Sequence, residues 1–507
     1  MNNDSDFVLL CYSRNSPYSY DAHTPLSILC LGTFLESKGV RVEYFDERID
    51  GIGRLGELLK LKPLLVGFSV IGGYQIVSAA KLSRLVRRLS PESKIVWGGI
   101  SPTTLPELTA RENFVDYVVI GEGEETILEL YTDLKNQNGK TSVIHGLAWS
   151  ENGAFHRTPE RPPPDVESLP FVYQGKAAGM LARYMKRRSV REAVGYEISR
   201  GCPFLCTFCY SPGFHNQTRA KSTEKAAEEL DRLKSLGARD LDIYDDTLFG
   251  ARRRDFPEYL DLLKKGEFAW IGNLRINMLD EDLLGRIESS GCKWLYFGIE
   301  SDDDAVLKAI KKGYTAAAVK EGLRVIGRSS LPTVFSLIYG LPLQGEKDKL
   351  GHYLDFAQSL HRQHPKAEIQ IQSYVPLPGN ELYPQAVKWG FTPPQRLLDW
   401  ANQDHFKVAN PWLADPALAN KVYISSFLAF RYRRHLSHFP VNLFAYPLHR
   451  LSLWRVRKRF FRFHAETLAY NAVLALSQFF ASIYFGMRNF LFRFSALAPR
   501  KARPCAE

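Results

Sequence analysis

The chain has 507 residues, and at roughly 100–200 residues per domain this length predicts about three or four packed units. Hydrophobic residues make up 45 % of it and charged residues 24 %, which excludes disorder and low-complexity fibres for most of the length. Seven cysteines are too few for a disulfide scaffold, and residues 1–6 lack the basic and apolar pattern of a signal sequence. We therefore predict a reduced, cytoplasmic protein with a packed core.

The net charge of +11 is concentrated near the end of the chain. Residues 421–507 hold fifteen Lys and Arg against two acidic residues, whereas the rest of the chain holds 51 basic and 53 acidic residues. A basic excess confined to one end indicates a surface for an anionic partner such as a membrane face. Because the remainder is slightly acidic, the charge pattern argues against a nucleic-acid partner at the site of chemistry.

The basic end contains two patterns that bear on a membrane. Residues 455–462 mix cations with aromatic side chains, and residues 468–487 carry no charge. Polar residues recur within the uncharged run at helical spacing, which predicts a buried helix or a helix lying on an anionic surface rather than a membrane span. We expect peripheral contact with the inner face of the membrane through residues 421–507.

Residues 1–140 alternate short β-type runs with helical runs, which is typical of a parallel sheet covered by helices. The expected strands are 7–11, 40–45, 64–68, 94–97 and 117–120. The turns that follow them carry Ser69, Gly98, Gly99, Gly121 and Glu122. Ligands of open α/β sheets lie outside the carboxyl ends of the strands, and glycines let the backbone approach a ligand closely. We therefore predict a doubly wound sheet with a ligand site at these turns.

A Pro-rich stretch at residues 157–170 cannot continue a helix or a central strand, so residues 141–180 are expected to be a linker. Residues 181–390 resume the alternation of strand and helix. The expected strands there are 196–199, 240–244, 270–276, 294–298, 334–339 and 368–374. Six consecutive units predict a partial (β/α)6 parallel barrel with its chemistry at the carboxyl ends of the strands. Residues 391–507 are expected to form a helical, basic C-terminal region.

Three of the seven cysteines, Cys202, Cys206 and Cys209, directly follow the first expected barrel strand. A redox pair needs only two thiols. A structural zinc site needs a fourth ligand, for which His215 and Cys292 are the candidates. A cubane iron-sulfur cluster held by three thiolates instead keeps one iron open for another ligand. The Cys-x3-Cys-x2-Cys spacing in this position favours the cluster.

This segment resembles the cluster loop of the radical S-adenosylmethionine (SAM) superfamily, in which the loop follows the first strand of a partial parallel barrel. The resemblance implies that Cys202, Cys206 and Cys209 hold a [4Fe-4S] cluster whose open iron is chelated by the amino and carboxylate groups of SAM. It also implies that an electron from the cluster cleaves SAM to a 5′-deoxyadenosyl radical, which takes a hydrogen atom from an unactivated carbon. A flavodoxin or ferredoxin would supply the electron.

Several strand-end segments look like those of radical SAM enzymes that carry an N-terminal cobalamin-binding domain. They are Tyr244-Asp245-Asp246-Thr247, Gly298-Ile299-Glu300-Ser301 and Tyr339-Gly340-Leu341-Pro342. Taken singly, each also fits a helix cap or a turn. Taken together, the resemblance implies that Asp245 and Glu300 point into the barrel mouth and hold the ribose or amino group of SAM.

The resemblance extends to the first domain. Residues 24–36 are similar to the first helix of those cobalamin-binding domains, and the turns with Ser69, Gly98, Gly99, Gly121 and Glu122 are similar to their loops, which implies that these turns surround cobalamin. Cobalamin mutases use an Asp-x-His-x-x-Gly motif whose histidine is the lower cobalt ligand. This chain has Asp21-Ala22-His23, but Leu26 replaces the glycine. His23 is thus either a cobalt ligand or a hydrogen-bonding loop residue.

Together these observations predict a cobalamin-dependent radical SAM enzyme. We expect a methyltransferase that acts at an unactivated carbon of an apolar small molecule, such as a lipid or a tetrapyrrole. One alternative is a ring-forming or oxidising reaction like that of the anaerobic magnesium-protoporphyrin ester cyclase. Another is a tRNA-modifying radical SAM enzyme with a degenerate first domain. A non-catalytic, membrane-associated scaffold would have little use for the three-cysteine loop.

Overall fold

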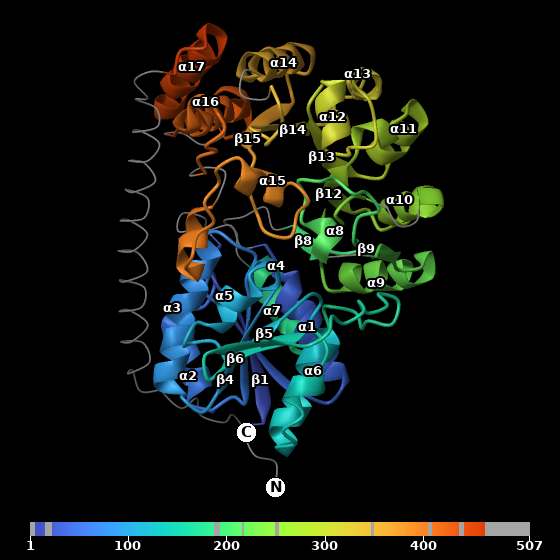
Figure 1. The fold of residues 1–507 in the computed structure, drawn as a ribbon. Helices are drawn as coiled ribbons and strands as arrows, with labels where there is room; N and C mark the ends of the chain where they lie inside the picture. The colour runs from blue at the N-terminus through green and yellow to red at the C-terminus, as the bar shows by residue number, and fades with distance from the viewer. Residues whose placement is uncertain are drawn as a thin grey trace.

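The computed structural model describes residues 6–15, 23–186, 193–214, 217–248, 253–345, 349–403, 408–435 and 441–461. Two α/β bodies are stacked on each other, the first formed by the N-terminal third of the chain (Figure 1). Each is built on a sheet whose core strands are parallel and are covered by helices. The predicted fold class, a doubly wound domain followed by a partial barrel and a helical region, is confirmed.

The first body is built on a seven-stranded sheet. In spatial order its strands are β2 (Arg41–Asp46), β1 (Phe7–Tyr12), β3 (Leu65–Ser69), β4 (Lys94–Gly98), β5 (Tyr117–Val119), β6 (Leu147–Glu151) and β7 (Ala154–Arg157). The first five are parallel. Their order places a topological switch between β1 and β3, which is where doubly wound sheets bind ligands. β1 is apolar and buried along its whole length, as expected of a strand covered on both faces.

Helices cover the faces of this sheet (Figure 1). They are α1 (Leu26–Ser37), α2 (Ile52–Leu59), α3 (Tyr74–Leu89), α4 (Ile100–Thr104), α5 (Pro106–Ala110) and α6 (Glu124–Asn136). A further helix, α7 (Gly175–Met185), packs against α1 although it follows the sheet in sequence. Its buried side chains belong to the core that α1 also lines. The core of the first body is therefore completed by residues beyond its last strand.

The segment expected as a linker is structured over much of its length. β6 and β7 form an antiparallel hairpin, and β6 pairs with β5 and so extends the first sheet. The two residues of the turn, Asn152 and Gly153, both have positive φ, as a tight hairpin of matching twist requires. This Asn-Gly pair was the available sequence signal. The short, half-polar strands on either side lack the apolar run of a buried strand, so the hairpin was not anticipated.

The second body is a six-stranded sheet in which all neighbouring strands are parallel. In spatial order its strands are β8 (Val194–Tyr196), β11 (Asp240–Ile243), β12 (Ala269–Leu274), β13 (Cys292–Glu300), β14 (Thr333–Tyr339) and β15 (Glu368–Ser373). Their spatial order is also their order along the chain, as in a barrel. Among the described residues no pairing joins β8 to β15, so the barrel is open between them.

Helices accompany the barrel strands, and four of the six begin at a short polar side chain that caps the helix. They are α9 (Thr223–Ser235), α10 (Phe256–Lys265), α11 (Glu281–Ser289), α12 (Asp304–Ala309), α13 (Ala316–Ile326) and α14 (Leu350–Gln363). The side chains of Ser222, Asp280 and Thr315 each accept a hydrogen bond from a backbone N–H in the first turn of the helix that follows. Such caps satisfy N–H groups that have no partner within the helix.

The C-terminal region packs beside the barrel and returns to the first body. It contains α15 (Tyr383–Lys388), the 3-10 helix η5 (Leu397–Asn402), α16 (Pro416–His435) and α17 (Val441–Lys458). α16 lies along β15 and α17 packs on α16, whereas η5 contacts α3. None of the helices in the described part of the chain combines the length and the apolar character that a membrane span needs. The uncharged run at residues 468–487 lies outside the described residues.

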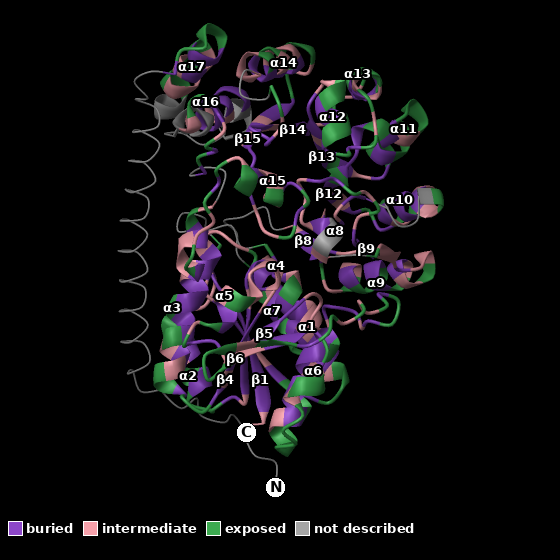
Figure 2. Cartoon of the chain, viewed as in Figure 1, coloured by how far each residue is buried: buried purple, intermediate pink, exposed green. Residues whose placement is uncertain are grey.

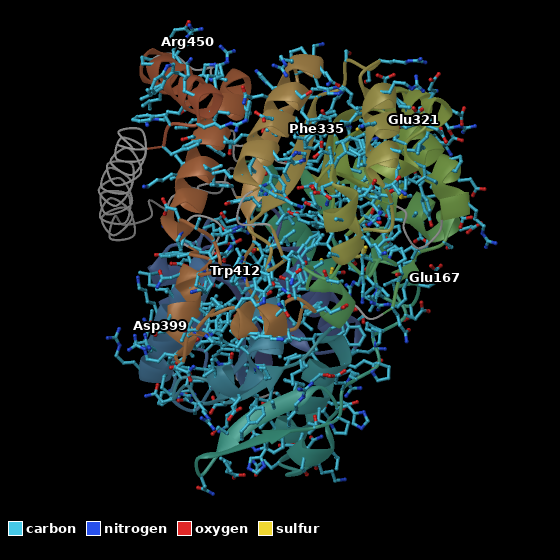
Figure 3. The ribbon with its side chains drawn as sticks, turned by 45° about the horizontal axis from the view of Figure 1, so that its top comes forward. Glu167, Glu321, Phe335, Asp399, Trp412 and Arg450 are labelled. Carbon is cyan, nitrogen blue, oxygen red and sulfur yellow. The ribbon has the colours of Figure 1, made fainter. Side chains whose placement is uncertain are left out.

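One hydrophobic core crosses the boundary between the two bodies. Phe68 and Trp97 of the first sheet share it with Leu341 and Tyr374 at the barrel strand ends and with Trp400 of η5. The strands of both sheets are largely buried (Figure 2). Trp412, labelled in Figure 3, packs between the two cores, and its indole N–H donates to the carbonyl oxygen of Gly340 (3.0 Å). The contact between the bodies therefore includes an apolar interior.

Candidate active site

The three cysteines of the predicted cluster loop lie between β9 (Ser199–Arg200) and α8 (Ser211–Phe214), beyond the carboxyl end of the first barrel strand. All three are free thiols; Cys206 is buried, and Cys202 and Cys209 are half-buried. The N–H of Cys209 donates to the carbonyl oxygen of Cys206 (3.0 Å). This bond holds the last two cysteines on one turn of the loop.

The middle of the loop is fixed by two distant segments. The N–H of Thr207 donates to the carbonyl oxygen of Ile310 (3.1 Å), beyond α12. The carbonyl oxygen of Thr207 accepts from the N–H of Leu382 (3.0 Å), beyond β15. The loop is thus anchored through both the backbone N–H and the backbone carbonyl group of Thr207. These two bonds limit the positions that the cysteine thiols on either side can take.

The chemistry of these thiols fits an iron-sulfur cluster. Burial raises the pKa of Cys202, and it raises that of Cys209 to about 11, so both thiols need a nearby positive charge such as iron to ionise. The N–H of Ser211 donates to Sγ of Cys209 (3.4 Å), a contact that stabilises a thiolate. In the described ranges no three His, Cys, Asp or Glu side chains are arranged to share one metal ion. Thiolates of a cubane cluster bind different iron atoms and need not converge on one point.

The structure does not bring Cys292 to the three cysteines as a fourth ligand. Cys292 begins β13, and its thiol donates to the carbonyl oxygen of Trp294 (3.5 Å). The cysteine loop lies at the carboxyl ends of the parallel strands, so Cys292 is at the opposite end of the barrel. His215, the other candidate, lies outside the described residues.

A cavity of about 590 Å³ lies between the carboxyl edge of the first sheet and the barrel mouth. Its first wall includes all five residues predicted at the ligand site of the first domain, namely Ser69, Gly98, Gly99, Gly121 and Glu122. Its second wall comes from the barrel and the cysteine loop, namely Glu197, Arg200, Tyr210, Asp242, Tyr244 and Asp246. The cysteine loop reaches the cavity through Tyr210, which follows Cys209. The predicted cofactor sites of the two bodies therefore meet at one cavity.

Two of the cavity glycines are required by the backbone. Gly99 has a φ of +99°, and a Cβ there would lie 2.8 Å from the carbonyl oxygen of Val70. Gly121 has a φ of +77°, and a Cβ there would meet no protein atom within 4 Å. A side chain at Gly121 would therefore project into open space at the cavity wall. Gly98 has ordinary room for a Cβ, so its identity is less constrained.

Arg200 joins the cysteine loop to the first domain. Its guanidinium contacts the carboxylates of Glu122 (2.8 Å) and Glu124 (2.7 Å), and all three side chains are less than 10 % exposed. Glu197 also pairs with Arg200 (2.8 Å), and Arg219 forms a second ion pair with Glu122. Burial alone would lower the pKa of Arg200, but these carboxylates raise it well above its ordinary value. The turn after β5 and the start of the cysteine loop are thus held together by buried charges.

Asp245 does not face the cavity. Its carboxylate is fully buried and accepts hydrogen bonds from the N–H groups of Ile198 (2.9 Å) and Ser199 (3.1 Å) and from the Ser199 hydroxyl (2.5 Å). Burial raises the pKa of Asp245 to about 7, and the three donors oppose that shift. Asp245 therefore fixes the strand that leads into the cysteine loop. Its neighbour Asp246 lines the cavity and accepts from the Ser211 hydroxyl (2.8 Å).

Glu300 lies at an irregular point of the barrel. It ends β13 beside a register shift in the pairing with β14, and its φ of +65° is rare for a residue with a side chain. Its carboxylate contacts Nζ of Lys312 (2.7 Å), and both side chains are buried. Strained residues of this kind cluster at functional sites. Glu300 thus lies at the carboxyl end of a barrel strand, as expected. Its carboxylate, however, already forms an ion pair with Lys312.

His23 lies in the cavity wall, with its side chain about half exposed. Its Nδ1 is 3.8 Å from a carboxylate oxygen of Asp242, on the barrel strand β11. Burial raises the pKa of Asp242, and the charge of His23 opposes the shift. Because Nδ1 of His23 faces Asp242, the other ring nitrogen, Nε2, is the one that could bind a second partner. Cobalt ligation by His23 stays a prediction.

Sequence reasoning missed three cations that surround the cysteine loop. Arg200, Arg275 and Lys312 are all buried. Arg275 follows β12 and its Nη1 lies 3.8 Å from Sγ of Cys206. The position of Arg275 at a strand end was a usable signal, because such residues of a parallel barrel face the site of chemistry. The sequence around Arg200 and Lys312 gives no sign that these two side chains would be buried.

Two family models match the chain in these two bodies. Residues 18–131 match the B12 binding domain, and residues 196–355 match the Radical SAM superfamily. The chain belongs to the radical SAM superfamily. It carries a B12 binding domain ahead of its radical SAM domain and is a cobalamin-dependent radical SAM enzyme, with SAM, a [4Fe-4S] cluster and cobalamin as its cofactors. The match supports a small-molecule substrate and a reductant for this enzyme.

Relatives of this radical SAM enzyme align with different shares of the chain. A Pyrococcus horikoshii protein named as an uncharacterized methyltransferase, PH0819, is 28 % identical over 370 residues, covering 70 % of this chain and 78 % of that protein. The anaerobic magnesium-protoporphyrin IX monomethyl ester cyclase of Synechocystis is 28 % identical over 275 residues, covering 53 % of this chain and 54 % of the cyclase. The solved structure of OxsB, a cobalamin-dependent S-adenosylmethionine radical enzyme, matches with a TM-score of 0.70 at 18 % identity, covering 95 % of this chain and 75 % of that one.

Proposed function

We propose that this radical SAM enzyme transfers a methyl group to an unactivated carbon of a small molecule. The observation that carries the proposal is the cavity of about 590 Å³ onto which both the turns of the first sheet and the barrel mouth open. Bound there, the cofactors supply an electron for the cleavage of SAM and a carrier for the methyl group. The chain itself binds and orients them at this cavity.

We assign the cofactors to the residues as follows. The cluster is held by Cys202, Cys206 and Cys209. Cobalamin is surrounded by Ser69, Gly98, Gly99, Gly121 and Glu122, which share one wall of the cavity. SAM would bind beside the cluster at the barrel mouth, where Asp246 lines the cavity and Glu300 ends a barrel strand as the second candidate carboxylate. Asp245 acts through the strand that it fixes rather than by contact with SAM.

The relatives support methyl transfer and one alternative. PH0819 is named as a methyltransferase and aligns with most of this chain. Identity to the magnesium-protoporphyrin IX monomethyl ester cyclase supports ring formation on a tetrapyrrole as the second candidate. Both possibilities are consistent with a bulky, apolar substrate.

We also propose that the basic C-terminal region contacts an anionic membrane surface to reach such a substrate. Arg457 and Lys458 are exposed at the end of α17, and the nearby rings of Trp454 and Phe460 are 47 % and 40 % exposed. Cations beside exposed aromatic rings suit the interface of a membrane. Arg455 does not belong to this surface, because it is buried and donates to the carbonyl oxygen of Phe460 (3.1 Å).

The products of SAM distinguish the two reactions. The anaerobically reconstituted enzyme is incubated with dithionite, cobalamin, SAM labelled in its methyl group and a small-molecule extract of the native cells. Methyl transfer requires S-adenosylhomocysteine and 5′-deoxyadenosine together, and a molecule of the extract must gain the labelled methyl group. Formation of 5′-deoxyadenosine with a substrate that loses hydrogen and gains no label would support the cyclase-like reaction instead.

A further inference from the structure

Arg275 is buried beside the cysteine loop. It follows β12 and is 6 % exposed. Its guanidinium lies 3.6 Å from the ring centre of Phe204, within the cysteine loop, and 5.0 Å from that of Tyr314. The two rings hold the flat guanidinium in place through cation–π contact. Arg275 is therefore a fixed part of the loop's surroundings rather than a mobile surface side chain.

The polar contacts of Arg275 do not include a carboxylate in the part of the chain that the structure describes. Nη1 donates to Sγ of Cys206 (3.8 Å), and Nη2 donates to the carbonyl oxygen of Lys312. Nε is buried with no hydrogen-bond partner. The positive charge of Arg275 is thus taken out of water, and among the described residues the thiol of Cys206 is the one acidic group to which it donates a hydrogen bond.

Lys312 provides a contrast within the same surroundings. Its Nζ is 2.7 Å from the Glu300 carboxylate, so its charge is compensated inside the protein. Burial alone would lower the pKa of Lys312, but the charge of Glu300 raises it. A buried cation without such a partner is costly, because the desolvation of the charge is not offset by an ion pair. The structure therefore calls for a negative charge beside Arg275 from another source.

We propose that Arg275 is the counter-charge of the iron-sulfur cluster and raises its reduction potential. A cluster held by thiolates carries negative charge, which increases when it accepts an electron from a reductant. A fixed cation that donates a hydrogen bond to a ligating sulfur stabilises the reduced form more than the oxidised form. The inference rests on the proposed assignment of Cys206 as a cluster ligand.

The test is a redox titration with dithionite, followed by the electron paramagnetic resonance signal of the reduced cluster. We expect R275Q to bind iron like the wild type and to shift the midpoint potential to a more negative value. R275K, which keeps the charge without the planar fork, should give a smaller shift in the same direction. The control K311Q removes an exposed cation that pairs with Glu381, in the segment next to Lys312, and should give no shift.

A second measurement uses the wild-type protein and does not depend on the folding of a variant. Reduced enzyme labelled with ¹⁵N-arginine should show a hyperfine coupling between the cluster and an arginine nitrogen, and R275K should lack it. A wild-type midpoint in iron-loaded R275Q, or no coupling in the labelled wild type, would overturn the role of Arg275. Failure of the wild type to bind a cluster would instead refute the assignment of the cysteines.

Discussion

The guanidinium of Arg200 lies 2.8 Å from the carboxylate of Glu122, and this buried ion pair connects the two halves of the active site. Glu122 belongs to the turn that follows β5 in the B12 binding domain. Arg200 stands two residues before Cys202 in the radical SAM domain. The cobalamin-side turn and the cysteine loop therefore cannot shift independently, which is a property that two cofactors acting on one substrate require.

Replacement of Arg200 by Met should destabilise the contact between the domains strongly. It would leave Glu124 buried without its cation, and the loss of one partner from a buried ion pair costs about 3–5 kcal/mol. The free energy of unfolding, measured by chemical denaturation of the cofactor-free protein, checks this. Arg157→Ala is the control, because Arg157 and Glu160 form an exposed pair whose loss should cost about 1 kcal/mol or less. Equal effects of the two substitutions would contradict the role of Arg200.

Gly121→Val should prevent cobalamin binding while leaving the cluster in place. The new side chain meets no protein atom and projects into open space at the cavity wall. Cobalamin uptake is measured by absorbance after gel filtration, and iron is measured in the same fractions. Gly39→Val is a matched control, since Gly39 has the same φ of +77° and equally open surroundings but does not line the cavity. Normal cobalamin uptake by Gly121→Val would place the cofactor elsewhere.

Simultaneous replacement of Cys202, Cys206 and Cys209 by Ala should remove the iron and the formation of 5′-deoxyadenosine. These thiols are the ligands that we assign to the cluster. A second triple variant, with Cys11, Cys30 and Cys292 replaced by Ala, changes the same number of free thiols and should keep both. Iron analysis and chromatography of the nucleoside products measure the outcome. Iron and activity retained in the first variant would end the radical SAM assignment of this loop.

Changing Arg457, Lys458 and Arg459 to Gln should weaken co-sedimentation with anionic vesicles. Each cation near such a surface contributes about 1 kcal/mol at modest salt, so the three together affect binding strongly. Binding of the wild type should require anionic lipid and decline as salt is added. Arg455 is left unchanged, because it is buried and its loss would disturb packing. A wild-type protein that ignores vesicles of every composition would remove the proposed membrane contact.

Much of the fold was predictable because its strands are short apolar runs between helical patterns. The expected barrel strand at 334–339 is found at Thr333–Tyr339, and the expected strand at 368–374 is found at Glu368–Ser373. The hairpin β6–β7 was missed because its strands are short and half-polar, and α7 was missed because a Pro-rich stretch precedes it. Local patterns indicate periodicity, but they do not indicate which element will pair at a sheet edge.

Two parts of the candidate site were predictable from the sequence: the cysteine loop, from the spacing of its cysteines, and the ligand-binding turns, from glycines that follow the strands. The turns at Gly99 and Gly121 follow strands and meet at one cavity, as the topology of the sheet requires. The direction of a strand-end carboxylate was not predictable: Asp245 turns to Ile198 and Ser199, and its neighbour Asp246 faces the cavity. Which of two adjacent acids faces a cavity depends on backbone donors brought there by tertiary structure.

The two anchors of Thr207 also determine when the cysteine loop can acquire its final shape. Its hydrogen-bond partners, Ile310 and Leu382, are synthesised long after the cysteines have left the ribosome. At roughly 5–20 residues per second, the stretch up to Leu382 takes on the order of 10 to 35 s to appear. During that interval the thiols are unshielded and able to react with oxidants or stray metals. Delivery of iron and sulfide should therefore follow completion of the sixth barrel strand, which makes cluster insertion a late step in the maturation of this enzyme.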